Sequence, residues 1–169
     1  TQTGPAMELL IALLAAAVQS GTPILYATVG EMLTERSGVL NLGVEGLMMV
    51  GAFTAFIVSV LTGSPWLAFG AGGLAACVLA SLHGIVCIVF LGNQVVSGLA
   101  LAILGVGLAN YLGTPYIGEK SVGFFKQAVP VLEHIPVLGP VFFQQDVLVY
   151  LSYFLPLGLW FFLHRTRLG

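Results

Sequence analysis

One short stretch of an otherwise apolar chain carries the polar residues that are most able to do chemistry. They are Glu31, Glu35, Arg36, Asn41 and Glu45. Glu31 and Glu35 are one helical turn apart, so a helix would present both on one face. Ionisable groups in a membrane are costly and tend to face a bundle interior or a water-filled path. The stretch is therefore expected to face the interior of a helix bundle or a water-filled path. The alternative is a plain turn, with Asn41 capping the next helix and Glu45 near the positive end of that helix.

Histidines and cysteines do not assemble a second reactive site. His83, His134 and His164 fall on different predicted elements, while Cys77 and Cys87 lie in one apolar stretch, where a small hydrophobe is the simplest role. We therefore expect no catalytic residue, no metal and no cofactor. His83 is interpreted as a hydrogen-bond partner between helices, with a proton relay as the alternative.

Composition indicates a membrane protein. Of the 169 residues, 58% are hydrophobic and 7% are charged, whereas soluble domains carry about 25% charged residues. From Gly46 to Gly118 there is no Asp, Glu, Lys or Arg. The backbone of such a stretch must satisfy its own hydrogen bonds, and the apolar runs lack the period-two alternation of barrel strands. Net charge is −2 without a basic run, so nothing indicates nucleic acid as a partner.

The predicted fold is an all-α polytopic membrane protein with five transmembrane helices in one domain, 1–169. The expected spans are about 7–33, 42–62, 66–91, 94–113 and 147–163, since a spanning helix needs about 20 residues. Pro23 predicts a kink in the first span. Residues 114–146 are too polar and too rich in proline to cross, and we expect them to form an extracytoplasmic loop.

Arginine positions predict the orientation, because short cytoplasmic loops collect Lys and Arg. Arg36 follows the first span, and Arg165 and Arg167 follow the fifth, an even number of crossings later. Both sites therefore lie on one side, which we take as the cytoplasm. The N-terminus is then outside and the C-terminus inside. Lys120 and Lys126 in the outer loop argue against this, but neighbouring glutamates offset them.

Small residues predict close contacts between helices. One stripe runs through Gly72, Ala76, Ala80 and Gly84, and a second through Gly98, Ala102, Gly105, Ala109 and Gly113. In lipid, such stripes let helix backbones approach each other. Gly38, Gly43 and Gly46 further predict a backbone that bends or is closely approached, as in the broken helices of transporters.

Four segments carry a resemblance to a known family. They are "TERSGVLNLGVEGLMMVGA" at 34–52, "GNQVVSGLAL" at 92–101, "IPVLGPVFF" at 135–143 and "RTRLG" at 165–169. The chain resembles the permease subunits of bacterial ABC importers of the nucleoside and simple-sugar group, which are related to the branched-chain amino-acid and ribose permeases. The signature residues are Glu35, Arg36, Gly38, Asn41, Gly43, Glu45 and Gly46.

The resemblance implies the N-terminal portion of a permease about twice this length, in a bacterial inner membrane. Arg165, Arg167 and Gly169 would begin the cytoplasmic coupling segment. The implied partners are a second permease subunit, a cytoplasmic ATP-binding subunit, an extracytoplasmic substrate-binding protein and the lipid bilayer. The chain has no Walker A pattern, so we expect another chain to bind ATP. The outer loop would dock the binding protein, or else lie as a flap on the membrane.

The implied activity is import of a small polar solute, with a nucleoside favoured over a simple sugar or a branched-chain amino acid. Polar groups at helix ends or within spans are candidates for the path: Asn41, Glu45, Asn93, Gln94, Ser97 and Asn110. Asn93 or Gln94 could instead cap the fourth span. A secondary transporter is the rival class, but inverted repeats are expected there and we detect none.

Overall fold

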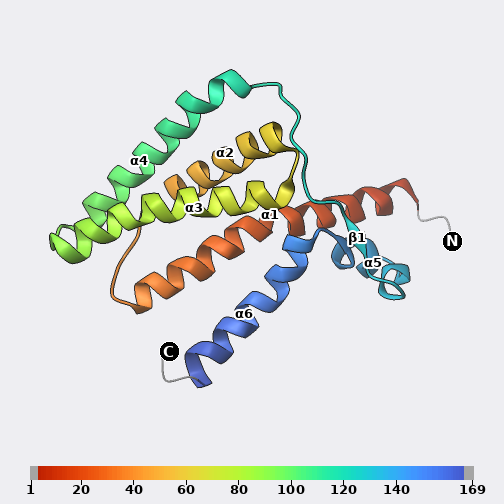
Figure 1. Cartoon of the computed structure of the whole chain (residues 1–169). Helices are drawn as coiled ribbons and strands as arrows, with labels where there is room; N and C mark the ends of the chain where they lie inside the picture. The colour runs from red at the N-terminus through yellow and green to blue at the C-terminus, as the bar shows by residue number, and fades with distance from the viewer. Residues whose placement is uncertain (1–3, 166–169) are drawn as a thin grey trace. The chain divides into compact units, whose positions relative to one another are not determined.

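The computed structural model describes residues 4–165 and is helical over most of that length (Figure 1). The long helices are α1 (Pro5–Arg36), α2 (Val44–Thr62), α3 (Pro65–Gly84), α4 (Gln94–Gly113) and α6 (Val147–Arg165). A π-helical turn, Ile85–Val89, continues α3, and a 3-10 turn, Thr114–Tyr116, continues α4. The remaining elements are short: β1 (Gln127–Ala128), a 3-10 turn (Leu132–His134), α5 (Leu138–Phe142) and β2 (Gln144–Gln145).

The described residues contain five helices that are long and apolar enough to cross a membrane, as predicted. The all-α polytopic class is therefore confirmed, while the direction in which the helices cross stays a prediction. The helical assignment of α1 continues through Pro23, and the Thr22 hydroxyl donates a hydrogen bond to the Val18 carbonyl at 3.0 Å. The third span, Pro65–Val89, agrees with its predicted bounds of 66–91 to within two residues. Its α-helix ends at Gly84 and the chain continues as a π-turn, a feature often found at functional positions.

The chain divides into two compact units. One contains Thr1–Val29 with Phe124–Gly169, and the other contains Gly30–Gly123. In the second unit, α2 packs against both α3 and α4 (Figure 1). The predicted single domain 1–169 stays a prediction.

Glycines make the contacts of α2 possible. A Cβ atom on Gly46 would lie 2.7 Å from the Ala102 Cα, and one on Gly105 would collide with the Gly46 backbone. On the other side of α2, a Cβ on Gly72 would lie 2.6 Å from the Gly51 carbonyl oxygen. The predicted stripe on α4 is thus a true contact surface.

The predicted stripe on α3 is correct only in part. Gly72 is buried against α2, but a Cβ on Gly84 would meet nothing within 4 Å. The buried face of α3 instead runs through Ala68, Gly72, Leu79 and His83. Small size therefore matters at the crossing with α2 and not along the whole stripe.

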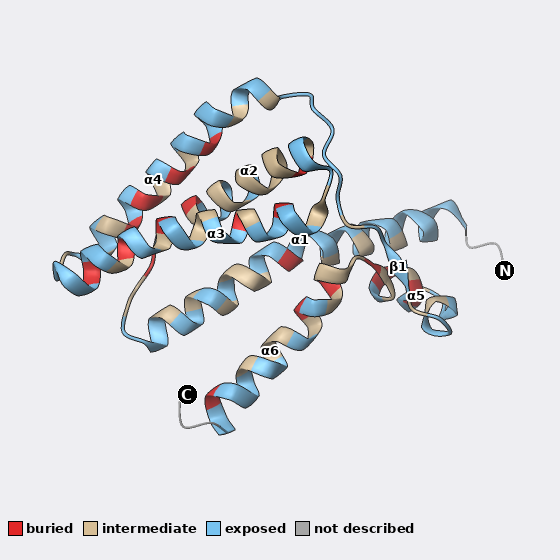
Figure 2. Ribbon diagram, in the orientation of Figure 1, coloured by how far each residue is buried: buried red, intermediate tan, exposed pale blue. Residues whose placement is uncertain are grey.

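Apolar side chains cover most of the outside of these helices. Buried residues form narrow strips and the rest of each long helix is exposed (Figure 2). Leu74 and Ile103 are 69% and 76% exposed. Exposed apolar surface on this scale marks contact with lipid or with other proteins.

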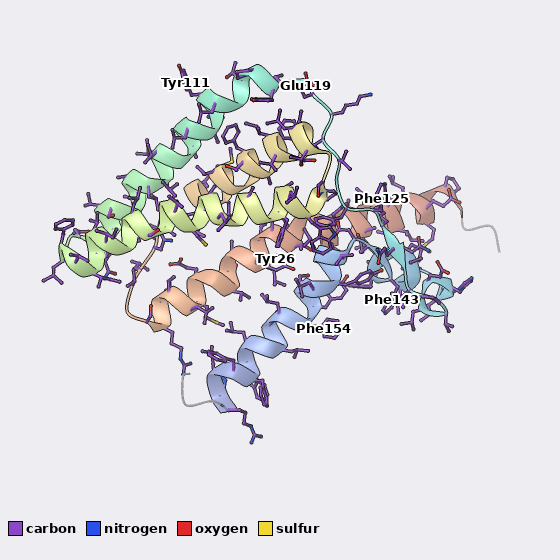
Figure 3. The ribbon with its side chains drawn as sticks, viewed as in Figure 1. Tyr26, Tyr111, Glu119, Phe125, Phe143 and Phe154 are labelled. Atoms are coloured by element: carbon purple, nitrogen blue, oxygen red, sulfur yellow. The ribbon has the colours of Figure 1, made fainter. Side chains whose placement is uncertain are left out.

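The first unit joins the N-terminal part of α1 to α6 and to the short elements before it. The Tyr26 hydroxyl donates a hydrogen bond to the Leu148 carbonyl at 2.8 Å (Figure 3). The Gln145 side chain is 1% exposed, and its amide nitrogen donates to the carbonyls of Val141 and Ala15. Residues 124–146 are thus a folded segment tied to helices, although none of it spans.

Ser59, near the end of α2, fixes the chain that follows α4. Its hydroxyl donates to the Val122 carbonyl at 2.6 Å and accepts from the Val122 N–H at 2.9 Å, and Ser59 is 4% exposed. We expect Ser59→Ala to cost about 0.5–1.5 kcal/mol and to speed proteolysis at 117–123, because both backbone groups of Val122 lose their protein partner. Limited proteolysis of the purified full-length permease measures this. Ser81→Ala is the matched control, since among residues 4–165 the Ser81 hydroxyl bonds to carbonyls of its own helix, those of Cys77 and Val78. Equal digestion of both variants would contradict the anchoring role.

Candidate functional site

The candidate site is the loop between α1 and α2, Ser37–Gly43, which we call the α1–α2 loop. It contains the centre of the sequence signature. The loop leaves α1 through Gly38, whose φ of +88° suits glycine. The N–H groups of Gly38 and Val39 bond back to the carbonyls of Glu35 and Thr34. The predicted bend is therefore real, and it occurs at Gly38.

Glu31 holds the loop from α1. One carboxylate oxygen accepts a hydrogen bond from the Asn41 backbone N–H at 2.9 Å, and the other accepts from the Thr34 hydroxyl at 3.2 Å. Asn41 is 7% exposed, so its N–H needs this acceptor. Glu31 thus completes the loop, whereas Glu35, one turn later, is exposed.

Gln94 holds the loop from the start of α4. Its side-chain oxygen accepts from the Leu40 N–H at 2.8 Å, and its amide nitrogen donates to the Gly38 carbonyl at 3.2 Å. One amide therefore satisfies both a donor and an acceptor of irregular backbone. Gly98, one turn further along α4, packs against the backbone of Leu42 and Gly43, where a Cβ would lie 2.8 Å from the Leu42 nitrogen.

His83 reaches the loop from α3. The ring is 3% exposed, with Nε2 3.2 Å from the Leu40 carbonyl oxygen and Nδ1 3.0 Å from the Ser97 hydroxyl. Cys87 lies against the ring, with its sulfur 3.5 Å from Nε2. The interpretation of His83 as a hydrogen-bond partner between helices agrees with these contacts.

Four of the six path candidates form side-chain hydrogen bonds within the described residues, and the other two do not. Asn41, Gln94 and Ser97 take part in the contacts around the loop. Asn93 caps α4, because its side-chain oxygen accepts from the Val96 N–H at 3.1 Å.

Glu45 and Asn110 are exposed on α2 and α4. Among residues 4–165, neither side chain has a hydrogen-bonding or ionic partner. These two polar groups are therefore available to other molecules.

The alternative interpretation of the loop as a plain turn included a cap of α2 by Asn41, and that part of it is wrong. The N-cap is Gly43, and no side chain bonds to the first turn. Asn41 instead accepts from the Gly43 N–H at 2.9 Å, two residues along the chain. This short-range bond tightens the turn before the helix begins. Glu45 does lie in the first turn of α2, where the helix dipole favours a carboxylate.

The remaining signature and coupling residues lie at helix ends, at glycine contacts or outside the described residues. Arg36 is exposed in the last turn of α1. Arg165 is the last residue of α6, while Arg167 and Gly169 lie outside the described residues. Gly43 and Gly46 are buried contact positions, as the glycine spacing predicted. Within residues 4–165, no three side chains of His, Cys, Asp or Glu come together as metal ligands.

Sequence reasoning missed the joint role of Glu31, His83 and Gln94. Each had been considered by itself, because they are far apart in the chain. A signal did exist: all three are polar residues that the predicted topology brings to the cytoplasmic ends of three spans. Irregular backbone at that level needs partners, and these are the side chains that can reach it.

Comparison with known proteins identifies the family of this chain. Residues 12–169 match the family described as branched-chain amino acid transport system / permease component. A putative glucose ABC transporter permease protein, TsgC13 of Haloferax volcanii, is 42% identical over 96% of this chain and 51% of its own length. The guanosine ABC transporter permease protein NupQ of Bacillus subtilis is 32% identical over 96% of this chain and 55% of its own length.

A third relative is also named as an ABC transporter permease protein. The nucleoside ABC transporter permease protein NupC of Lactococcus lactis is 30% identical over 88% of this chain and 50% of its own length. The chain spans about half the length of these curated relatives. No solved structure matches. With the family match over nearly the whole chain and five membrane-spanning helices, the chain belongs to the permease component family of the branched-chain amino acid transport system type.

Proposed function

We propose that this chain is the N-terminal part of a permease subunit of an ATP-driven importer, in which it forms part of the path for a nucleoside. Membership of the permease family supports the transport role. Two relatives named for guanosine and nucleoside transport support the solute, together with the resemblance of the segment "NLGVEG" to nucleoside-type members.

The observation that carries this proposal is that side chains of α1, α3 and α4 form hydrogen bonds with the backbone of the α1–α2 loop. Alternating access works by moving packed bodies of helices relative to one another. A loop held by Glu31, His83 and Gln94 makes Gly30–Gly123 suited to move as one such body. The glycine contacts of α2 with α3 and α4 give that body a close-packed interior.

The proposed assembly contains a second permease subunit, a cytoplasmic ATP-binding subunit and an extracytoplasmic substrate-binding protein. Closure of the ATP-binding subunits would pull on a coupling segment that begins near Arg165. In the proposed orientation, the segment 114–146 faces outward and contributes to docking of the binding protein. The chain would perform no covalent chemistry itself.

A simple sugar is the second candidate solute, and a specific observation favours it. The 42% identical relative is named as a putative glucose permease. Nucleosides and sugars share hydroxyl groups that a few polar side chains in an apolar cavity can recognise. Glu45 and Asn110 are the groups we assign to the path, because both are exposed and uncommitted among the described residues.

Uptake by the complete transporter tests the function and the solute together. Cells would express the full-length permease with its ATP-binding and substrate-binding partner proteins, and take up radiolabelled guanosine or glucose. We expect guanosine uptake that excess unlabelled nucleoside removes and glucose leaves unchanged. Inactivating the Walker A lysine of the ATP-binding subunit should abolish uptake. Uptake that survives this change would indicate a secondary transporter, and competition by glucose alone would indicate the sugar.

Glu45→Gln tests the path assignment. We expect this variant, at equal expression, to lower initial uptake about ten- to a hundredfold, because removing a charged hydrogen-bond partner of the solute costs about 1.5–3 kcal/mol. Glu119→Gln is the comparison, since Glu119 is also exposed and outside the spans. Equal uptake by the two variants would show that Glu45 only stabilises the start of α2 and does not contact the solute.

A further inference from the structure

His83 is a buried polar residue whose presence helix packing alone does not require. It lies on the buried face of α3 with Ala68, Gly72 and Leu79, and it is 3% exposed. An apolar side chain of similar volume would fill that space without the cost of burying a polar ring. The ring instead contacts two other parts of the chain, the α1–α2 loop and α4.

The partners of the ring define its proton positions. The Leu40 carbonyl can only accept a hydrogen bond, so Nε2 must carry a proton and donate. In the neutral ring, Nδ1 is then an acceptor, and the Ser97 hydroxyl donates to it. Both bonds are therefore satisfied by a single neutral tautomer.

The contact at Leu40 matters because both the N–H and the carbonyl of this residue form hydrogen bonds with side chains. Its carbonyl accepts from His83 on α3, while its N–H donates to Gln94 on α4. The next N–H, that of Asn41, donates to Glu31 on α1. Three consecutive backbone groups are thus bound by side chains from three helices, and His83 alone supplies the contact from α3.

We propose that His83 is a positioning residue for transport: through the Leu40 carbonyl it couples α3 to the α1–α2 loop, so that the inner ends of these helices move together. This inference rests on the proposed function for its consequence, because a loosened loop would slow the conformational step. It would leave recognition of the solute intact. Loss of the contact should therefore lower the maximal uptake rate and leave the apparent KM unchanged.

Two conservative variants separate the two bonds of the ring. In His83→Gln, the amide nitrogen can occupy the place of Nε2 and donate to Leu40. In His83→Asn, the shorter amide reaches only the place of Nδ1, near Ser97. We expect Gln to retain most of the maximal uptake rate, and Asn and Ala to lower it about five- to tenfold, as loss of one buried hydrogen bond predicts. Ser81→Ala, on the same helix, is the control.

A second experiment measures how accessible the α1–α2 loop is to a labelling reagent, and it needs no solute. A cysteine replaces Val39, which is half-buried beside Leu40, in full-length transporter that also carries Cys77→Ala. Labelling with a hydrophilic maleimide in permeabilised membranes should be about five- to tenfold faster with His83→Ala and near the parent rate with His83→Gln. Protein without the Val39 substitution gives the background from Cys87, which is buried.

The outcomes distinguish this inference from the proposed function. Unchanged labelling with His83→Ala, or equal uptake by the Gln and Asn variants, would overturn the positioning role. A raised KM with an unchanged maximal rate would also overturn it. If the parent transporter takes up neither nucleoside nor sugar, the proposed function fails, while the labelling experiment still decides whether His83 holds the loop.

Discussion

Gly105→Ala is expected to prevent α2 and α4 from packing together in the full-length permease, whereas Gly107→Ala is expected to be tolerated. A Cβ on Gly105 would collide with the backbone of Gly46, which cannot rotate away as a side chain could. A Cβ on Gly107 would meet nothing within 4 Å. Overpacking that forces backbone shifts costs about 1–3 kcal/mol or more. Thermal unfolding of the purified variants in detergent, with yield of monodisperse protein, measures the difference.

The reciprocal change gives a stricter test. Gly46→Ala should be about as harmful, since its Cβ would lie 2.5 Å from the Leu101 carbonyl oxygen and 2.7 Å from the Ala102 Cα. Because both substitutions act on one contact, the double variant should lose less stability than the sum of the two single losses. Strict additivity, or a Gly105→Ala protein as stable as Gly107→Ala, would contradict this close approach.

Glu31→Ala is the second change with a large expected effect. It removes the acceptor of the buried Asn41 N–H, and a buried donor without a partner costs about 1–3 kcal/mol. Thr34 is affected less, because its hydroxyl also donates to the Glu31 backbone carbonyl at 2.8 Å. We therefore expect a lower unfolding temperature and loss of most uptake, measured on the same preparation and in the same cells.

Two further variants show whether the loss in Glu31→Ala comes from the missing hydrogen bond or from the missing charge. Glu31→Gln keeps a side-chain oxygen for Asn41 but lacks the charge, so its loss should fall between those of wild type and Ala. Glu35→Ala should have little effect, because the Glu35 side chain is exposed and has no partner among residues 4–165. If Glu35→Ala is as harmful as Glu31→Ala, the charge of the segment matters and the hydrogen bond does not.

Much of the fold could be predicted because the bilayer restricts it so strongly. The uncharged stretch from Gly46 to Gly118 left few alternatives to helices, and all five spans agree with the predicted ones to within a few residues. The π-turn after Gly84 was missed, since no proline or polar residue marks it. Such a turn depends on tertiary contacts and not on local preference.

The candidate site was predicted less completely, and the reason is physical. Glycine spacing pointed to a bend and to close approach, and both occur at Gly38 and Gly46. The partners of the loop could not be derived, because the bond between Leu40 and Gln94 joins positions 54 apart and the bond to His83 joins positions 43 apart. Hydropathy reports which residues lie in the membrane, but it carries no information about such pairings.

The bond between Leu40 and Gln94 also has a consequence for the order of biosynthesis. Leu40 leaves the ribosome 54 residues before the side chain that accepts its N–H. The hairpin of α1 and α2 can therefore enter the membrane early, but its turn acquires its full set of partners only after α4 has begun to emerge. A nascent chain stopped before Gln94 would hold an unfinished turn, which quality-control proteases could recognise.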